Sequence, residues 1–265
     1  MKNAVLDIQK MSKNMRKVII ETSFNCGYPA HIGGALSIVD ILATLYGKVL
    51  NFQIHNPIDR FILSKGHGLL GLLSVLYCKG FLEKNELLKF QSNGSELIAH
   101  PIVNPKIGIE SSNGSLGQGL SLGVGIAISY KKRKKNGNIY VLVGDGECYE
   151  GAIWEAAISA TESKLDNLTL IVDCNGFQND GSINSKMNFS EIRKKWSGFG
   201  WNTINCDGHN IDKILQSLNS KCPNKPTAII AKTIKGKGVK FMENNNDWHH
   251  NRLTKKLYDE AMLGL

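Results

Sequence analysis

Residues 139–181 constrain the fold more than any other part of this sequence. They begin with an apolar, β-branched run at 139–143, which is typical of a strand buried on both faces. Apolar residues at helical spacing follow over 150–163, and a second apolar run occupies 168–172. The stretch therefore predicts two parallel strands joined by one crossover helix.

Polar residues stand where each of these two strands ends. Gly144-Asp145-Gly146 follows the first strand, and Asn175 follows the second. A right-handed crossover places both at one carboxyl edge of the sheet, where open α/β sheets bind ligands. A carboxylate, an amide oxygen and a backbone carbonyl converging there suit a hard cation such as Mg²⁺. A bare Gly-Asp-Gly is also typical of a capping turn, so both interpretations stay open on these residues alone.

Bulk composition favours one large α/β domain. The chain has 265 residues, 42% of them hydrophobic, which is enough for a sizeable core. The net charge of +9 comes mostly from scattered lysines. The one dense basic run, at 131–135, follows an apolar helix whose negative end it complements, so we do not expect a nucleic-acid partner.

The six cysteines form no C-x-x-C pair and are interpreted as reduced thiols. The N-terminus predicts an amphipathic helix over 3–24 instead of a signal peptide. We also expect no stretch long enough to span a membrane. These patterns indicate a cytoplasmic protein with no membrane association.

Histidines recur at the boundaries of predicted elements. His31 precedes a predicted helix at 38–47. Lys65 and His67 follow a short strand and open another helix, a position that favours phosphate binding. A lone histidine in such a place is more often structural, and His209, after a strand at 200–206, is interpreted as a turn and capping residue.

The remaining patterns complete an alternation of strands and helices. A glycine-rich loop at 112–121 opens a small-residue helix at 122–130. A helix is predicted at 189–199 and a last buried strand at 226–231. This alternation predicts an α/β fold with a mostly parallel sheet.

Six ordered motifs, spread over nearly the whole chain, resemble the thiamine diphosphate-dependent transketolase family. They are His31-Ile32-Gly33-Gly34-Ala35-Leu36-Ser37, Asp59-Arg60-Phe61-Ile62-Leu63-Ser64-Lys65-Gly66-His67, the glycine-rich loop, the Gly-Asp-Gly and Asn175 pair, Lys232-Thr233-Ile234-Lys235-Gly236-Lys237-Gly238, and Trp248-His249. The sequence departs from the family pattern at Ala99 and His250, where glycine is usual.

The resemblance implies a thiamine diphosphate-binding fold, with helices on both faces of the sheet and residues 1–265 forming a single N-terminal diphosphate-binding domain. It also implies that Asp145, Asn175 and the carbonyl of Phe177 bind Mg²⁺, which Ca²⁺ or Mn²⁺ could replace. That metal would in turn hold the diphosphate.

The family's site residues carry over to matching positions of this chain. The implied cofactor contacts are Lys65, His67, Gly114, Ser115, Leu116, Gly146, Glu150, Asn175, Lys235 and His249. The implied catalytic residues are His31, His67, His100 and His249, with His31 and His249 as proton acceptors at the donor sugar's hydroxyl.

The implied activity is transfer of a two-carbon ketol unit between sugar phosphates such as xylulose 5-phosphate and ribose 5-phosphate, as in the pentose phosphate pathway. Single-chain enzymes of the family are roughly twice this length or more. We therefore expect an N-terminal subunit that needs a separate C-terminal, pyrimidine-binding subunit, which would supply the activating glutamate. Self-association through 116–130 and 150–157 would give a heterotetramer.

Two other functions share part of this pattern. The α subunit of a 2-oxo acid dehydrogenase E1 component has the same Gly-Asp-Gly and Asn signature. The four histidines and the Asp59 to His67 motif favour transketolase over it. A non-catalytic cofactor-binding or regulatory subunit is the other alternative.

Overall fold

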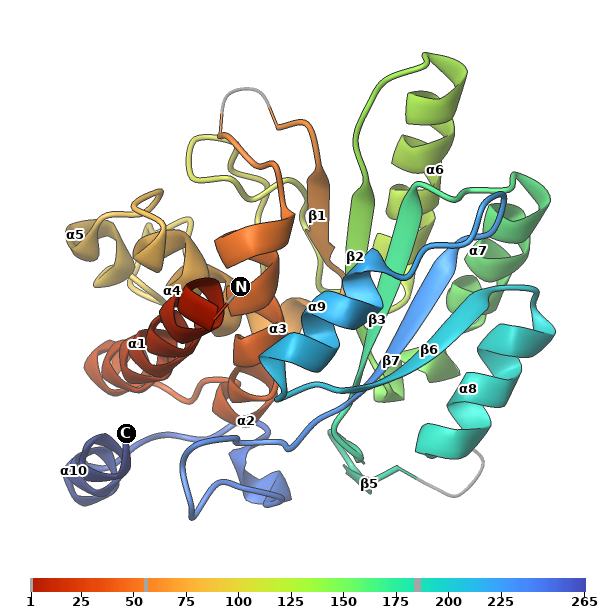
Figure 1. Ribbon diagram of the computed structural model, residues 1–265. Coiled ribbons are helices and arrows are strands. Elements are labelled where there is room, and N and C mark those ends of the chain that lie inside the picture. Colours follow the sequence, from red (N-terminus) through yellow and green to blue (C-terminus); the bar gives the residue numbers. More distant parts are fainter. Residues whose placement is uncertain (1, 55–56, 184–186) are drawn as a thin grey trace.

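The sheet at the centre of the fold has five parallel strands in the order β1-β2-β3-β7-β6. The computed structural model describes residues 2–54, 57–183 and 187–265. The strands are β1 (Arg60–Leu63), β2 (Ile139–Gly144), β3 (Leu168–Cys174), β6 (Asn202–Asp207) and β7 (Thr227–Lys232). Helices cover both faces of this sheet (Figure 1), which confirms the predicted fold class.

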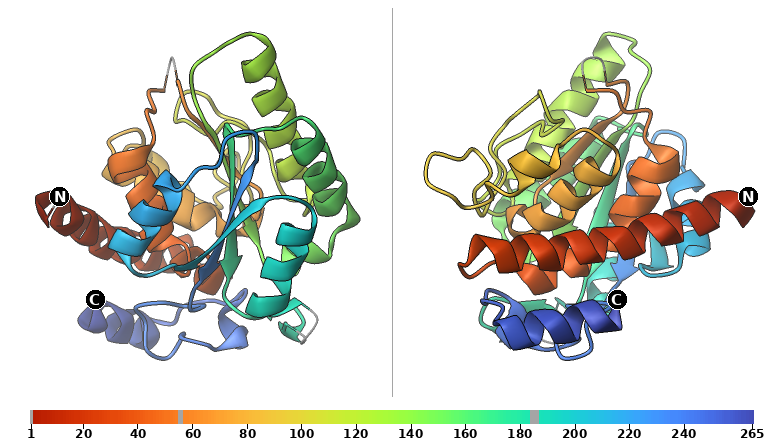
Figure 2. Two further views of the ribbon diagram at one scale, coloured as in Figure 1. Left: turned by 45° about the vertical axis from the view of Figure 1, so that its right-hand side comes forward. Right: turned by 90° about the vertical axis from the view of Figure 1, so that its left-hand side faces the viewer.

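The helices divide between the two faces. The first face packs against α1 (Lys2–Cys26), α2 (Ile32–Leu36), α3 (Val39–Thr44), α4 (Leu69–Cys78) and α9 (Ile211–Asn219). The second face packs against α6 (Gln118–Lys132), α7 (Gly151–Glu162) and α8 (Phe189–Gly198). Figure 2 shows α10 (Lys255–Gly264) lying alongside α1, and α5 (Lys84–Leu87) follows α4.

Alternate side chains of each central strand enter different cores. In β2, Tyr140 and Leu142 join the core under α1 to α4, whereas Val141 and Val143 join the core under α6 to α8. All six residues of β2 are buried. The uninterrupted apolar run in the sequence follows from this burial on both faces.

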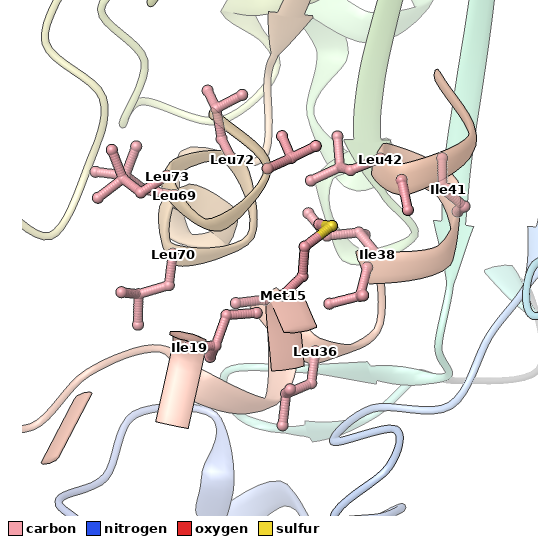
Figure 3. Packing of buried hydrophobic residues seen from close by; sticks show 14 of the residues in the cluster. Met15, Ile19, Leu36, Ile38, Ile41, Leu42, Leu69, Leu70, Leu72 and Leu73 are labelled. Carbon is pink, nitrogen blue, oxygen red and sulfur yellow. The ribbon is translucent and has the colours of Figure 1, made fainter. Parts of the chain in front are cut away.

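The first core is built around α1. Met15 and Ile19 point from α1 toward Leu36, Ile38 and the leucines of α4 (Figure 3), and both are 0% exposed. Helices α2, α3 and α4 therefore pack directly against α1.

Residues Ile32–Val49 correct one expectation. By length and composition this segment is apolar enough to cross a membrane, so the expectation that no stretch is long enough was wrong. It forms α2, α3 and a π-helix (Leu45–Val49), and 83% of it is buried within the fold. Core packing accounts for its apolar character.

Some element boundaries differ from the prediction. A helix was expected from residue 38, but the chain is helical from Ile32, where α2 begins. The helix expected at 150–163 starts at Gly151, after a 3-10 turn (Gly146–Tyr149). Helix α6 begins four residues before the predicted start at 122. The two-stranded hairpin of β4 (Phe177–Gln178) and β5 (Gly181–Ser182) was not predicted, because two-residue strands carry no periodic signal.

Strand order brings the carboxyl ends of three strands together. After β3 the chain passes to the outer strand β6 and returns to β7, which pairs with β3. Residues that follow β2, β3 and β7 thus meet at one carboxyl edge, the lower edge of the sheet in Figure 1. Asp145 and Asn175 lie there, as the crossover predicted.

Helix α6 approaches the sheet closely at Gly123. A Cβ carbon at Gly123 would lie 2.5 Å from Val141 Cγ2, whereas one at Gly125 would have no neighbour within 4 Å. We expect Gly123→Ala to lower the free energy of unfolding by about 1–3 kcal/mol, because overpacking outweighs the gain in helix propensity.

Gly125→Ala in the same helix is the matched control, and it should raise stability by up to about 1 kcal/mol. Urea denaturation of both variants, at concentrations where the association state is unchanged, measures the difference. Equal stability of the two variants would contradict this packing.

Candidate active site

A cavity of about 270 Å³ opens at the carboxyl ends of β1, β2 and β3. Nine predicted site residues line it: Lys65, His67, Leu116, Asp145, Gly146, Glu150, Asn175, Phe177 and His249. Most of the remaining lining comes from the turn after β2 and the β4–β5 hairpin. A second cavity, of about 450 Å³ at the ends of β6 and β7, contains none of the predicted catalytic residues.

A buried ion pair crosses the floor of this site. Lys65 Nζ lies 2.6 Å from Asp173 Oδ2, and both side chains are 0% exposed. Lys65 also donates to the carbonyl of Gly34 at 3.0 Å. Burial alone would raise the pKa of Asp173, but the Lys65 ammonium and the hydrogen bonds to the carboxylate hold that pKa below its usual value.

Sequence reasoning missed Asp173 and Glu147. The signal for Asp173 was a carboxylate inside an apolar strand, which is stable there only with a partner. Glu147 accepts hydrogen bonds from Ser64 Oγ at 2.5 Å, from Gly117 N at 2.8 Å and from Gly144 N at 3.1 Å. It thereby joins the ends of β1 and β2 to the loop before α6.

Asp145 and Asn175 are held in fixed orientations. The Asp145 carboxylate accepts from Gly146 N at 2.9 Å and from Gly176 N at 2.7 Å. Asn175 donates through Nδ2 to Asp173 at 2.9 Å, which turns its Oδ1 toward Phe177 N, 3.0 Å away. Burial, and then the nearby Asp173, raises the pKa of Asp145 to about 7.

The four predicted catalytic histidines come together around His31. Its ring centroid lies 5.8 Å from that of His67, 5.5 Å from His100 and 5.6 Å from His249. The His67 and His249 rings stack at 5.4 Å. A fifth ring, His250, lies 4.5 Å from His31. We call these five residues the histidine cluster.

The pKa values of the four predicted catalytic histidines are lowered, which favours their neutral form at pH 7. Burial, followed by neighbouring His250 and His249, lowers the pKa of His31 to about 3. Burial, followed by Lys235 and Lys65, lowers the pKa of His249 to about 4. The pKa values of His67 and His100 are also lowered, first by burial. Among the described residues, His31 Nδ1 is buried without a hydrogen-bond partner.

Lys235 orients one ring of the cluster. Its Nζ lies 2.6 Å from Asn246 Oδ1 and 2.9 Å from His249 Nδ1. An ammonium can only donate, so Nδ1 accepts and the proton of neutral His249 sits on Nε2. Burial, and then Lys65, lowers the pKa of Lys235 to about 8.

The glycine-rich loop is only partly at the site. Leu116 lines the cavity, and a Cβ carbon on Gly114 would contact His100 Cγ at 3.7 Å. Ser115 is exposed and does not belong to the cavity lining. Glu150 is an exposed N-cap residue of α7 that reaches the cavity edge.

His209 lies outside the histidine cluster, in a network of its own. Its Nδ1 is 2.8 Å from Asp40 Oδ2, and its Nε2 accepts from Ile234 N at 2.9 Å. Arg16 pairs with the same Asp40 carboxylate at 2.6 Å. These contacts hold the segment that leads to Lys235.

Breaking the buried ion pair between Lys65 and Asp173 tests how much it contributes to the stability of the fold. Asp173→Asn leaves the Lys65 ammonium buried without a counter-charge, and we expect it to lower the free energy of unfolding by about 3–5 kcal/mol. Asp259→Asn, which breaks the exposed pair with Lys255, is the control and should cost at most about 1 kcal/mol. Similar losses in urea denaturation would argue against the pairing.

The lowered histidine pKa values predict acid sensitivity of the fold. Between about pH 6.5 and 4 the unfolded chain binds protons at His31 and His249 that the folded chain does not. Stability should therefore fall as the pH drops through this window. Urea denaturation at pH 7.5 and pH 5 should show a weaker pH dependence for the His31→Asn, His249→Asn double variant than for the wild type. An unchanged pH dependence of stability in the double variant would show that His31 and His249 do not cause the acid sensitivity.

Comparisons with known proteins agree with this geometry. Residues 9–261 match the family described as "Transketolase, thiamine diphosphate binding domain". The chain is 39% identical over 249 residues to one subunit of the apulose-4-phosphate transketolase of Actinobacillus succinogenes, covering 92% of this chain and 90% of that protein. It is 36% identical over 266 residues to the 6-deoxy-6-sulfo-D-fructose transketolase subunit SqwG of Clostridium sp., covering 98% and 96%.

Among solved structures, transketolase from Campylobacter jejuni superimposes with a TM-score of 0.85 at 27% identity. The match covers 98% of this chain but 42% of that enzyme, so the chain spans less than half of its length. With the family match over nearly all of the sequence, these relationships show that the chain belongs to the transketolase thiamine diphosphate-binding domain family.

Proposed function

We propose that this chain is the N-terminal subunit of a transketolase, which transfers a two-carbon ketol unit between sugar phosphates. The observation that carries the proposal is the group of His31, His67, His100 and His249, with lowered pKa values, beside the cavity lined by Asp145 and Asn175. Buried neutral imidazoles can both accept and donate protons at sugar hydroxyls.

The residues around Asp145 fit a divalent cation. Within residues 2–54, 57–183 and 187–265, no three His, Cys, Asp or Glu side chains are placed to hold a metal ion. The donors at this site are instead a carboxylate, the Asn175 amide oxygen and the Phe177 carbonyl. Mg²⁺ accepts such oxygens and completes its shell with waters or phosphate. A cation here would also offset the buried charge that raises the pKa of Asp145.

The cavity suits a diphosphate cofactor. Lys65 lines it, and Lys235 lies behind the lining residue His249, whose Nδ1 it contacts at 2.9 Å. Both ammonium groups are already oriented by protein acceptors. Thiamine diphosphate, when bound, supplies the electron sink that cleavage of a ketose carbon–carbon bond requires. Asp145, Asn175 and Phe177 would hold the metal, and Leu116 and Gly146 would border the cofactor.

The histidines would manage protons on the substrate. The Nε2–H of His249 can donate to a sugar oxygen, because Lys235 occupies Nδ1. His31, whose Nδ1 is buried, would accept a proton from the donor hydroxyl through Nε2. His67 and His100 are the other polar side chains next to His31 and His249.

A separate partner chain is part of the proposal. The two relatives described above match over at least 90% of their own length and are named as subunits. The partner would be a C-terminal, pyrimidine-binding subunit carrying the activating glutamate. Exposed Leu122 of α6 and Ile158 of α7, 43% and 51% accessible, support self-association through these helices.

The substrates are proposed at the level of sugar phosphates. Xylulose 5-phosphate as donor and ribose 5-phosphate as acceptor are the first pair to test. The relatives are named for apulose 4-phosphate and 6-deoxy-6-sulfo-D-fructose, so both belong in the same panel.

A coupled ketol-transfer assay tests the function. We expect turnover only when this chain is combined with its C-terminal partner, thiamine diphosphate and Mg²⁺. Asp145→Asn should abolish turnover, and it should also remove the rise in melting temperature that cofactor and Mg²⁺ give the wild-type chain.

Asp259→Asn, which changes an exposed side chain of α10, is the control and should retain both readouts. Full turnover by this chain alone would contradict the subunit proposal. Pyruvate oxidation with a lipoyl acceptor would instead support the 2-oxo acid dehydrogenase alternative. Cofactor binding without turnover on any substrate of the panel would favour a regulatory subunit.

A further inference from the structure

His250 belongs to the histidine cluster, yet the mechanism above gives it no role. Its side chain is exposed, and its ring centroid lies 4.5 Å from that of His31. This is the shortest of the four ring separations around His31. No described residue forms a hydrogen bond with its imidazole, so both ring nitrogens are available to a ligand.

The backbone fixes His250 in this position. Ala30 and Asn251 form an isolated antiparallel bridge, with N to O distances of 2.9 Å and 3.1 Å. The bridge sets the residue after Ala30 beside the residue before Asn251, and these are His31 and His250. Trp248, 6% exposed, anchors the same segment in the core. The ring is therefore placed by main-chain pairing, although its own surface faces solvent.

His250 lies at the outer end of the site. The inner rings, His67 and His249, stack together and line the cavity with Lys65. His250 does not line that cavity. Its exposure and its proximity to the half-buried His31 place it on the solvent side of the proton-accepting group.

We propose that His250 is a specificity-determining residue that hydrogen-bonds a hydroxyl of the donor ketose, on the part of the carbon chain beyond the transferred two-carbon unit. The proposal rests on the ketol-transfer function above. A group at the mouth of the site contacts the substrate on the side where the sugar chain leaves the buried rings. An imidazole with two free nitrogens suits a neutral hydroxyl as donor or acceptor.

Two donors that differ only beyond the transferred unit provide the test. Xylulose 5-phosphate carries the hydroxylated chain, whereas hydroxypyruvate carries the same ketol unit attached to a carboxylate. With the assembled enzyme, His250→Ala should lower kcat/KM about tenfold for xylulose 5-phosphate, mainly through KM, since one hydrogen bond is lost. For hydroxypyruvate the change should stay below about twofold, because no such bond is made. His250→Gln should recover part of the loss.

Arg252→Ala, an exposed neighbour on the same segment, is the matched control and should leave both donors unchanged. Equal losses with the two donors would show a local distortion, and no loss with either would show that His250 does not contact substrate. Both outcomes overturn the proposal.

A binding measurement separates this proposal from the function itself. The His250 ring proton resonance, assigned by its absence in His250→Ala, should shift when xylulose 5-phosphate is added to the chain with its partner, cofactor and Mg²⁺. A shift without turnover would support the contact while refuting ketol transfer with this donor. Turnover by the wild type without a shift would overturn the role of His250 alone.

Discussion

The buried pair of Lys65 and Asp173 is the interaction on which the site depends. Neither charge has access to water, and each would be strongly unfavourable without the other. The pair also recruits Gly34 and Ser37 from the α2 region and Asn175 from the end of β3. These contacts connect segments from distant parts of the sequence at the carboxyl edge of the sheet. They fix the positions of the metal-binding candidates and of the inner histidines.

Burial next to two lysines decides the chemistry of the histidine cluster. Imidazoles in water would be partly protonated near neutral pH, but removal from solvent and positive neighbours lower the pKa values of His31 and His249 and favour their neutral form. Close packing makes this burial possible. A Cβ carbon on Gly34 would come within 3.1 Å of His67, and one on Gly33 within 2.7 Å of the Trp248 carbonyl. The two glycines after His31 therefore let rings from separate loops share one space.

Sequence patterns predicted the large elements well and the short ones poorly. The runs that became β2 and β3 were located to within two residues, because strands buried on both faces leave an uninterrupted apolar signal. Helix α1 was similarly clear from its periodicity. The π-helix and the β4–β5 hairpin escaped notice, because local pattern does not specify elements of two to five residues. The expectation that no stretch is long enough to span a membrane was wrong for Ile32–Val49 by length and composition only, and 83% of that segment is buried inside the fold.

The sequence by itself determined the parallel α/β class, the sheet edge at which Asp145 and Asn175 meet, and the residue types that gather there, because strand periodicity and crossover handedness are local rules. Only the tertiary structure decided which side chains form ion pairs and hydrogen bonds with one another. Asp173 pairs with a lysine 108 positions away, and Ser37 reaches the same carboxylate across 136 positions. The place of His250 beside His31 likewise depends on a backbone bridge between residues 30 and 251. Such contacts are set by packing over long separations, which no local pattern of residues encodes.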